Sequence, residues 1–388
     1  MREERFALVA GGGTAGHLQP ALAIGEALVS AGHGRDTIEF VGSGRGQDRA
    51  ALEGRGFPFT LLPGRGIVRS LRPADLWADL GALAGLVVSL PRAFGVVMRA
   101  RPRVVVSVGG YASLSTSLAA VVLGVPLVLV NVDAVPGAAN KLFGRFARAS
   151  AVGWEGSTLP RAVVTGTPVR PEIAAVGRTP VDRRAARASL GLPEDRDTVA
   201  VFGGSLGSRT INRAAAGLVD RWKDREDRSV YHIVGRRDWE QYAPAATGAD
   251  DTGPWRGTGL AVSRVPYEQR MEVVYAAADV VVCRAGAMTV AELAVAGVPS
   301  VLVPLPGAPG DHQTANARVL ERAGAAILLA DADCDAEALD VTLDGMLVDP
   351  SGLDAMGRRA AALGRHDAAA AGARVVEAHT RPRRRASP

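Results

Sequence analysis

Two glycine-rich turns, about half a chain apart, constrain this sequence more than any other feature. Each turn follows an apolar run and leads into a helical pattern: residues 6–10 precede the turn at 11–17, and residues 198–202 precede the turn at 203–208. Backbone N–H groups at the start of such a helix can face an anion. Two units of this kind predict an α/β chain with two Rossmann-like domains, each a doubly wound parallel sheet, facing each other across a cleft.

Apolar runs alternate with amphipathic stretches along the whole chain, a pattern typical of parallel α/β sheets. The predicted strands are 6–10, 38–41, 104–108, 127–130 and 162–165 in the first half, and 199–202, 231–234, 279–282, 300–303 and 326–329 in the second. We expect a first domain at 1–165 and a second at 166–380, with an interdomain linker near 166–195. The basic, proline-bearing segment 381–388 is predicted to be a disordered tail.

The composition limits the classes of binding partner to be expected for this chain. A formal net charge of +5 favours anionic partners, but no basic run is interleaved with aromatic residues, so nucleic acid is not expected. Cys283 and Cys334 lie in no motif, which fits a reduced cytoplasmic setting, and Cys283 is predicted to fill a core. No secretory signal precedes the first strand. The longest apolar stretch, 80–90, is shorter than the ~20 residues that span a bilayer.

The first turn has two interpretations. Gly11, Gly13 and Gly16 match the dinucleotide fingerprint, and Glu39 follows at a suitable distance, so a nicotinamide-dependent oxidoreductase is one alternative. Against it, Glu39 falls inside the next predicted strand, and His17 directly follows the last glycine. His17 would open a helix at the carboxyl ends of the strands, where the positive helix end favours the neutral imidazole that a general base needs. The alternative is a histidine that bonds only to nearby backbone groups.

Three further segments contain residues that could bind a ligand. The turn at 203–208 lacks the lysine of a P-loop but can hold a phosphate with its amides and Ser205. In the segment 284–292, Thr289 and Glu292 form either a capping box or a site in which Glu292 accepts hydrogen bonds from a ribose. The polar stretch 310–317 could bind sugar hydroxyls. Asp331 and Asp333 match a D-x-D pattern, although a solvated turn is the stronger interpretation.

Together these residues resemble the MurG family of N-acetylglucosaminyltransferases of peptidoglycan synthesis, from about Val9 to Ala326. The family's motifs GGTGGH, GGY, GNPVR, GGSQGA and SGALTVSE match residues 12–17, 109–111, 166–170, 203–208 and 285–292, and its next segment matches 311–317. The resemblance implies a GT-B fold, with UDP-GlcNAc as the donor substrate and lipid I as the acceptor. Two departures fall on the acceptor half: residues 112–116 replace a glycine-rich continuation, and Asn131-Val132-Asp133 replaces the family's EQN.

The resemblance also implies roles for particular residues. His17 is the expected catalytic base, and Asp133 is the competing carboxylate. The donor-binding set is Thr14, Gly16, Arg170, Ser205, Met271, Ala287, Met288, Thr289, Glu292, Gln313 and Asn316. The acceptor-side set is Gly109, Gly110, Tyr111, Asn131 and Asn140. No cofactor and no tight metal site are expected, and a weakly bound magnesium stays open.

Because lipid I lies in a membrane, the resemblance implies a peripheral enzyme at the cytoplasmic face. The stretch from Ile67 to Arg103 carries the apolar residues Leu71, Leu76, Trp77, Leu80 and Phe94, and the arginines around them are Arg65, Arg69, Arg72, Arg92, Arg99, Arg101 and Arg103. It is either a patch that docks on an anionic leaflet or a buried helix with a charged face. A UDP-GlcNAc 2-epimerase, the oxidoreductase and a non-catalytic nucleotide-sensing module remain the alternative functions.

Overall fold

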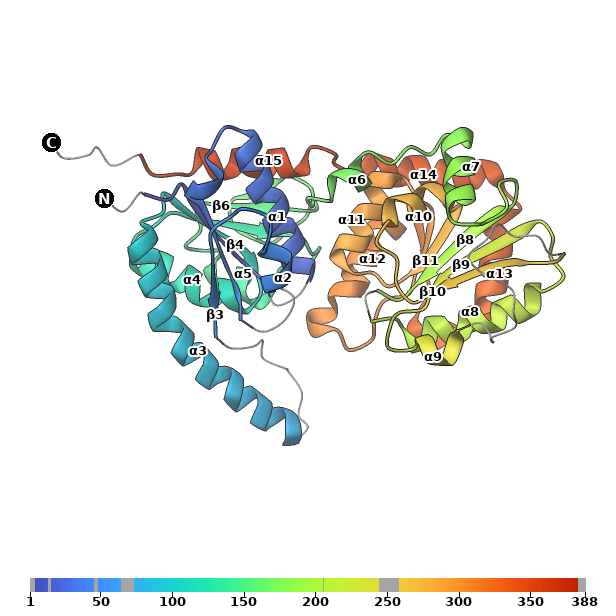
Figure 1. Ribbon diagram of the computed structural model, residues 1–388, viewed down its shortest axis with the longest axis horizontal. Helices are drawn as coiled ribbons and strands as arrows, with labels where there is room; N and C mark the ends of the chain where they lie inside the picture. Colours follow the sequence, from blue (N-terminus) through green and yellow to red (C-terminus); the bar gives the residue numbers. More distant parts are fainter. Residues whose placement is uncertain are drawn as a thin grey trace. The chain divides into compact units, whose positions relative to one another are not determined.

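The computed structural model describes residues 4–12, 15–44, 48–63, 73–204, 206–243 and 258–382, without the side chains of residues 15, 73–84, 86, 87 and 309. The chain divides into two compact units. Unit 1 comprises residues 1–170 and 365–388, and unit 2 comprises residues 171–364. Each unit has a parallel sheet with helices packed around it (Figure 1). The two Rossmann-like domains predicted from the glycine turns are therefore confirmed.

Within the described residues, unit 1 has a seven-stranded sheet in the order β3-β2-β1-β4-β5-β6-β7. Its strands are β1 (Ala7–Gly11), β2 (Ile38–Ser43), β3 (Phe59–Leu62), β4 (Val104–Gly109), β5 (Leu127–Asn131), β6 (Ala149–Val152) and β7 (Ala162–Val164). Its helices are α1 (Ala15–Ser30), η1 (Arg35–Thr37), α2 (Asp48–Leu52), α3 (Pro73–Ala100), α4 (Tyr111–Val122), α5 (Ala138–Phe143) and α15 (Ala368–Ala378). The central strands are buried on both faces, which explains their continuous apolar runs.

The described part of unit 2 has a six-stranded sheet in the order β10-β9-β8-β11-β12-β13. Its strands are β8 (Asp197–Phe202), β9 (Arg228–Ile233), β10 (Ala261–Val265), β11 (Val280–Cys283), β12 (Ser300–Leu302) and β13 (Ala326–Leu328). Its helices are α6 (Pro171–Ala174), α7 (Pro180–Ser189), α8 (Arg209–Trp222), α9 (Trp239–Tyr242), α10 (Met271–Ala277), α11 (Ala287–Ala296), η2 (Pro309–Asp311), α12 (His312–Arg322), η3 (Asp331–Asp333), α13 (Ala336–Leu347) and α14 (Pro350–Leu363).

All ten predicted strands are present, with ends that differ by no more than three residues. Strands β3, β6 and β10 were not predicted from the sequence. Cys283 ends β11 with no exposed surface, and burial raises the pKa of its thiol, so its predicted place in the core is confirmed.

The predicted extent of the second domain is wrong at its C-terminal end, because residues 365–388 belong to unit 1. Helix α15 packs on α1, where His33 Nε2 lies 2.8 Å from Glu377 Oε1. Arg381 is also tied down: its N–H donates to the Arg103 carbonyl at 3.1 Å, and its carbonyl accepts from Arg103 Nε at 2.8 Å. The predicted disordered tail therefore does not begin at Arg381, and residues 383–388 lie outside the described residues.

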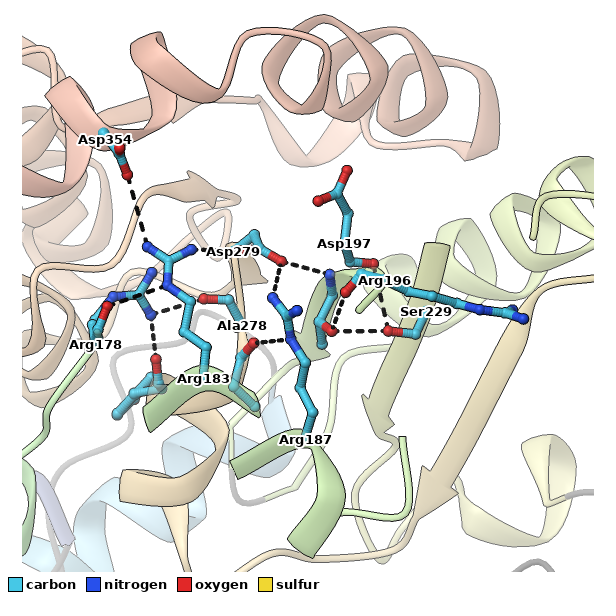
Figure 2. Close-up of polar contacts among 12 residues, drawn as sticks. Arg178, Arg183, Arg187, Arg196, Asp197, Ser229, Ala278, Asp279 and Asp354 are labelled. Carbon is cyan, nitrogen blue, oxygen red and sulfur yellow. Dashed lines mark hydrogen bonds and ion pairs between the residues drawn. The ribbon is translucent and has the colours of Figure 1, made fainter. Parts of the chain in front are cut away.

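Helix α7, which follows the start of unit 2, is joined to the sheet through Asp279 (Figure 2). One carboxylate oxygen lies 2.5 Å from Arg183 Nη1, and the other lies 2.6 Å from Arg187 Nη2. The N–H of Thr198 also donates to this carboxylate, at 2.7 Å. Asp279 is 7% exposed, so these donors replace the water that a buried carboxylate loses.

Candidate active site

Unit 2 contains a pocket of ≈ 670 Å³ at the carboxyl edge of its sheet. The pocket lies where the adjacent strands β8 and β11 end, and the chain leaves these two strands toward opposite sides of the sheet. Such a switch point is where α/β sheets bind ligands. The lining residues come from the turn after β8 and the start of α8, from the loops after β9, β11 and β12, from the starts of α11 and α12, and from η3.

The turn at 203–208 forms one wall of this pocket, and its glycines are required by its shape. A Cβ at Gly203 would collide with the backbone N of Ser208, and Gly207 has a φ of +83°. The turn ends at Ser208, whose Oγ caps α8 by accepting from the Ile211 N–H at 3.4 Å. The pocket is thus placed beside the positive end of a helix, as the phosphate interpretation requires. Ser205 lies outside the described residues.

The loops after β11 and β12 are joined by Gln313. Its Oε1 accepts from the Ala285 N–H at 3.2 Å and from the Leu305 N–H at 3.0 Å, and its side chain lines the pocket. Asn316 has no exposed surface, and its Nδ2 donates to the Ala285 carbonyl at 3.3 Å. Gln313 therefore lines the pocket, whereas Asn316 is buried and holds the Ala285 loop in place.

The capping-box interpretation of Thr289 and Glu292 is wrong. Helix α11 begins after Gly286 and has no side-chain cap, so Thr289 lies within its first turn, where it lines the pocket. Ala287 and Met288 lie in the same turn and are half-buried. The half-buried Glu292 accepts from the Tyr275 hydroxyl at 2.9 Å. Met271 lies one turn before Tyr275 on α10, so both predicted residues, Met271 and Glu292, neighbour Tyr275 rather than the pocket wall.

Sequence reasoning missed several pocket residues, above all Arg284 and Asp331. Arg284 follows β11 directly, and its Nη1 lies 2.6 Å from Asp331 Oδ1. Asp331 Oδ2 accepts from the Thr210 hydroxyl at 3.3 Å. The interpretation of Asp331 as part of a solvated turn is therefore wrong, since its carboxylate is bonded inside the pocket. Asp333, two residues on, is exposed as expected.

Two more arginines reach this pocket, Arg209 and Arg237, and they share one buried carboxylate. Arg237 Nη2 lies 2.6 Å from Asp238 Oδ2, and Arg209 Nε lies 3.7 Å from Asp238 Oδ1. The hydrogen bond from Arg237 holds the pKa of Asp238 below its usual value. The pocket rim is thus cationic, and Asp238, the carboxylate that pairs with both arginines, stays ionised.

In unit 1 the switch point lies between β1 and β4, and His17 occupies it. His17 lies in the first turn of α1, half-buried, with Gly16 beside it; Thr14 lies outside the described residues. The imidazole packs on the turn after β4: a Cβ at Gly109 would lie 2.8 Å from His17 Cδ2, and one at Gly110 would collide with the Gly12 carbonyl. The structure thus brings His17 together with Gly109 and Gly110, and these positions accept only glycine without strain.

Of the remaining acceptor-side residues, Asn131 ends β5 and Asn140 lies in α5, the helix that follows. Asn140 Nδ2 donates to Asn131 Oδ1 at 3.1 Å, and Asn131 Nδ2 donates to the Asp133 carbonyl at 2.7 Å. Asn131 and Asn140 are both 4% exposed, so they shape the turn that presents the half-buried Asp133. Tyr111 begins α4, and its hydroxyl donates to Ser89 Oγ at 3.4 Å. Arg170, the last residue of unit 1 before α6, is half-buried.

Glu39 does not fit a ribose-binding role. It is the second residue of β2, at 3% exposure, and Arg99 Nη2 lies 2.6 Å from its carboxylate, with Thr60 Oγ1 donating at 2.9 Å. A dinucleotide site needs this carboxylate at the other, carboxyl end of the strand. The structure therefore gives the nicotinamide alternative no support.

Helix α3 contains part of the stretch that was predicted either to dock on a membrane or to be buried. Phe94 packs against the core of unit 1, so it does not belong to an exposed patch, whereas Arg99 pairs with Glu39 but keeps 49% of its side chain exposed. Arg103 bonds to Arg381, while Arg92 and Arg101 are exposed. Residues Arg65, Arg69, Leu71 and Arg72, and the side chains of Leu76, Trp77 and Leu80, lie outside the described residues.

No helix in the described part of the chain is both long and apolar enough to cross a membrane. Nor does that part of the chain hold a group of three or more histidine, cysteine, aspartate or glutamate residues that could bind a metal ion.

Two Rossmann-like units, each with a glycine turn at its switch point, are the architecture of the GT-B glycosyltransferases. The glycosyltransferase family 28 N-terminal domain matches residues 7–152, and the family 28 C-terminal domain matches residues 198–371. The chain belongs to glycosyltransferase family 28 and, within it, to the MurG group.

Similarity to known proteins extends along nearly the whole chain. One from Acidothermus cellulolyticus, a UDP-N-acetylglucosamine--N-acetylmuramyl-(pentapeptide) pyrophosphoryl-undecaprenol N-acetylglucosamine transferase, is 39% identical, covering 97% of this chain and 98% of its own. The crystal structure of MurG from Acinetobacter baumannii has a TM-score of 0.72 at 25% identity, over 97% of this chain and 99% of its own. A Listeria monocytogenes structure assigned as a UDP-N-acetylglucosamine 2-epimerase has a TM-score of 0.61 at 16% identity, over 95% and 94% of the two chains, a likeness of fold alone.

Proposed function

We propose that this chain transfers GlcNAc from UDP-GlcNAc to the 4-hydroxyl of the muramyl sugar of lipid I, giving lipid II for peptidoglycan synthesis. The observation that carries the proposal is its end-to-end similarity to transferases named for this acceptor. The pocket at the switch point of unit 2 supports it, because a glycine turn beside a helix start suits the diphosphate of a sugar nucleotide. The 2-epimerase alternative has only a likeness of fold in its favour.

The donor would be held mainly by unit 2. The amides of the turn at 203–208, with Ser205 and Arg170, would hold the diphosphate, and Thr289 and Gln313 would contact phosphate or sugar. Glu292 would accept hydrogen bonds from the ribose hydroxyls. The backbone near Met271, Ala287 and Met288 would contact uracil or pyrophosphate, and Asn316 would keep the Ala285 loop in place.

The reaction would be a direct displacement with inversion. The acceptor O4 attacks the anomeric carbon of GlcNAc, and the bond from that carbon to the β-phosphate oxygen breaks. The electron pair leaves on UDP, and the proton of the acceptor hydroxyl passes to His17. A base for the acceptor proton and a cationic, amide-rich site for the leaving diphosphate are the two groups that such a displacement needs.

A pair of variants tests the assignment of the base. His17→Ala should bind UDP-GlcNAc with nearly the parental affinity but turn over about 10²–10⁴-fold more slowly, because a general base acts in the transition state. Asp133→Asn restores the amide that the family has at this position and should keep most of the activity. If Asp133→Asn loses activity while His17→Ala retains it, the base is Asp133.

The acceptor also implies a place for the enzyme at the cytoplasmic face of the cell membrane, in cell-wall growth and division. On α3, Val88 and Met98 are 51% and 56% exposed, and the exposed Arg92 lies near them in sequence. Exposed apolar and cationic side chains on one helix suit an anionic lipid surface. We therefore propose that α3 contributes to peripheral docking.

A further inference from the structure

We propose that Arg284, held in place by Asp331, is the main cation that binds the diphosphate of the sugar-nucleotide donor, and that Asp331 is its positioning residue. The inference rests on the proposed function, because it takes a nucleoside diphosphate to be the ligand of the unit 2 pocket. Both residues line that pocket together with the glycine turn at 203–208.

The guanidinium of Arg284 is fixed through one nitrogen. Nη1 donates to the carbonyl oxygens of Val303 and Pro304, both at 3.1 Å, and lies 2.6 Å from Asp331 Oδ1. Within the described residues, Nε and Nη2 have no hydrogen-bond partner. These two nitrogens form the edge of arginine that binds two oxygens of a phosphate side by side. Arg284 is therefore anchored on one side and keeps its phosphate-binding edge for a ligand.

Asp331 links this arginine to the phosphate turn. Its Oδ2 accepts from Thr210 Oγ1 at 3.3 Å, and Thr210 lies in the first turn of α8, directly after the turn at 203–208. One carboxylate thus connects the loop after β11 to the helix after β8. A cation and a set of backbone amides that are fixed relative to each other lose little entropy when an anion binds between them.

Arg284 is also the best shielded of the three arginines in the pocket. Its side chain is 11% exposed, whereas those of Arg209 and Arg237 are 79% and 42% exposed. Water screens an exposed charge, so the attraction between a phosphate and a cation is strongest at the least exposed one. Arg209 and Arg237 also share the single carboxylate of Asp238. The observations therefore favour Arg284 as the main contact with the diphosphate.

Calorimetric titration of the full chain with UDP and with uridine tests this inference, because only UDP carries the diphosphate. Arg284→Met should weaken UDP binding by about tenfold or more, and uridine binding should stay as in the parent. Asp331→Asn should weaken UDP binding by a smaller factor of about three to ten, again with no effect on uridine. Asp333→Asn, in the same turn but exposed, is the matched control and should bind both ligands like the parent.

A conservative variant keeps the test decisive if Arg284→Met fails to fold. Arg284→Lys retains the charge but loses the two-nitrogen edge, and should weaken UDP binding by roughly fivefold without changing uridine binding. Parental UDP affinity in the Arg284 variants, or an equal loss for UDP and uridine, would overturn the inference. A parent chain that binds neither UDP nor uridine would instead refute the proposed function.

Discussion

The buried His232 should make unit 2 sensitive to mild acid. His232 lies in β9 with no exposed surface, and its Nε2 lies 3.0 Å from Asn212 Oδ1. Since Asn212 Nδ2 donates to Val234 and Asp238, its Oδ1 accepts, and Nε2 carries the proton. Burial, with a smaller effect from Arg264, lowers the pKa of His232 from 6.5 to about 4.

The sign and size of the effect follow from proton linkage. Between about pH 6.5 and pH 4 the unfolded chain binds a proton at this residue and the folded chain does not, so the free energy of unfolding falls as the pH falls. At about pH 5 the two pKa values give a loss of about 2 kcal/mol relative to about pH 7.5. His232→Gln can donate to Asn212 in the same way but does not titrate.

Urea denaturation followed by circular dichroism, at about pH 7.5 and about pH 5, measures the difference. The parent should lose about 2 kcal/mol more than His232→Gln between the two conditions, because every other titrating group is common to both proteins. An equal loss in parent and variant would mean that His232 is not held neutral in the core, and the assignment of its burial would be wrong.

Three further predictions concern the donor site, the sheet and the membrane. Glu292→Ala should weaken UDP-GlcNAc binding by roughly ten- to a hundredfold, since hydrogen bonds to a charged group contribute ~1.5–3 kcal/mol; unchanged affinity by calorimetry would remove its ribose role. Asp279→Asn should reduce the free energy of unfolding by about 3–5 kcal/mol because it leaves two arginines short of their buried partner. In the same urea assay Asp354→Asn, whose carboxylate is 63% exposed, should change stability by less than about 1 kcal/mol. Reversal of Arg69, Arg72 and Arg92 to glutamate should release the chain from anionic vesicles, at about 1 kcal/mol for each basic residue; co-sedimentation equal to that of the parent would contradict docking by this segment.

The central strands could be predicted because burial on both faces demands continuous apolar sequence, as in β4 and β8. The strands that were missed lack that signal. β10, at the sheet edge, mixes Ser263 and Arg264 with valines, and β6 is built from small residues, Ala-Ser-Ala-Val. β3, an edge strand of the unit 1 sheet, is a short half-buried run. Edge position and small side chains both weaken the pattern on which the prediction depends.

In the candidate site, too, features with a local sequence signal could be predicted and features that depend on long-range packing could not. Glycine turns are visible in sequence because backbone shape dictates them, as the positive φ of Gly110 and Gly207 demonstrates. The contact between Arg284 and Asp331 depends on β11 and β13 ending at the same edge of the sheet, on either side of β12, and no local pattern encodes it. The return of α15 to unit 1 was missed for the same reason, since only the packing on α1 reveals it.

The proposed activity is tested most directly by incubating the purified chain with UDP-[¹⁴C]GlcNAc and a lipid I analogue and following the label. The account predicts that label enters the lipid fraction with stoichiometric release of UDP, and that His17→Ala slows this transfer by about a hundredfold or more. Turnover of UDP-GlcNAc that leaves the lipid unlabelled and yields UDP-ManNAc would instead identify an epimerase. No transfer to the lipid by a chain that binds UDP-GlcNAc would contradict the proposed acceptor.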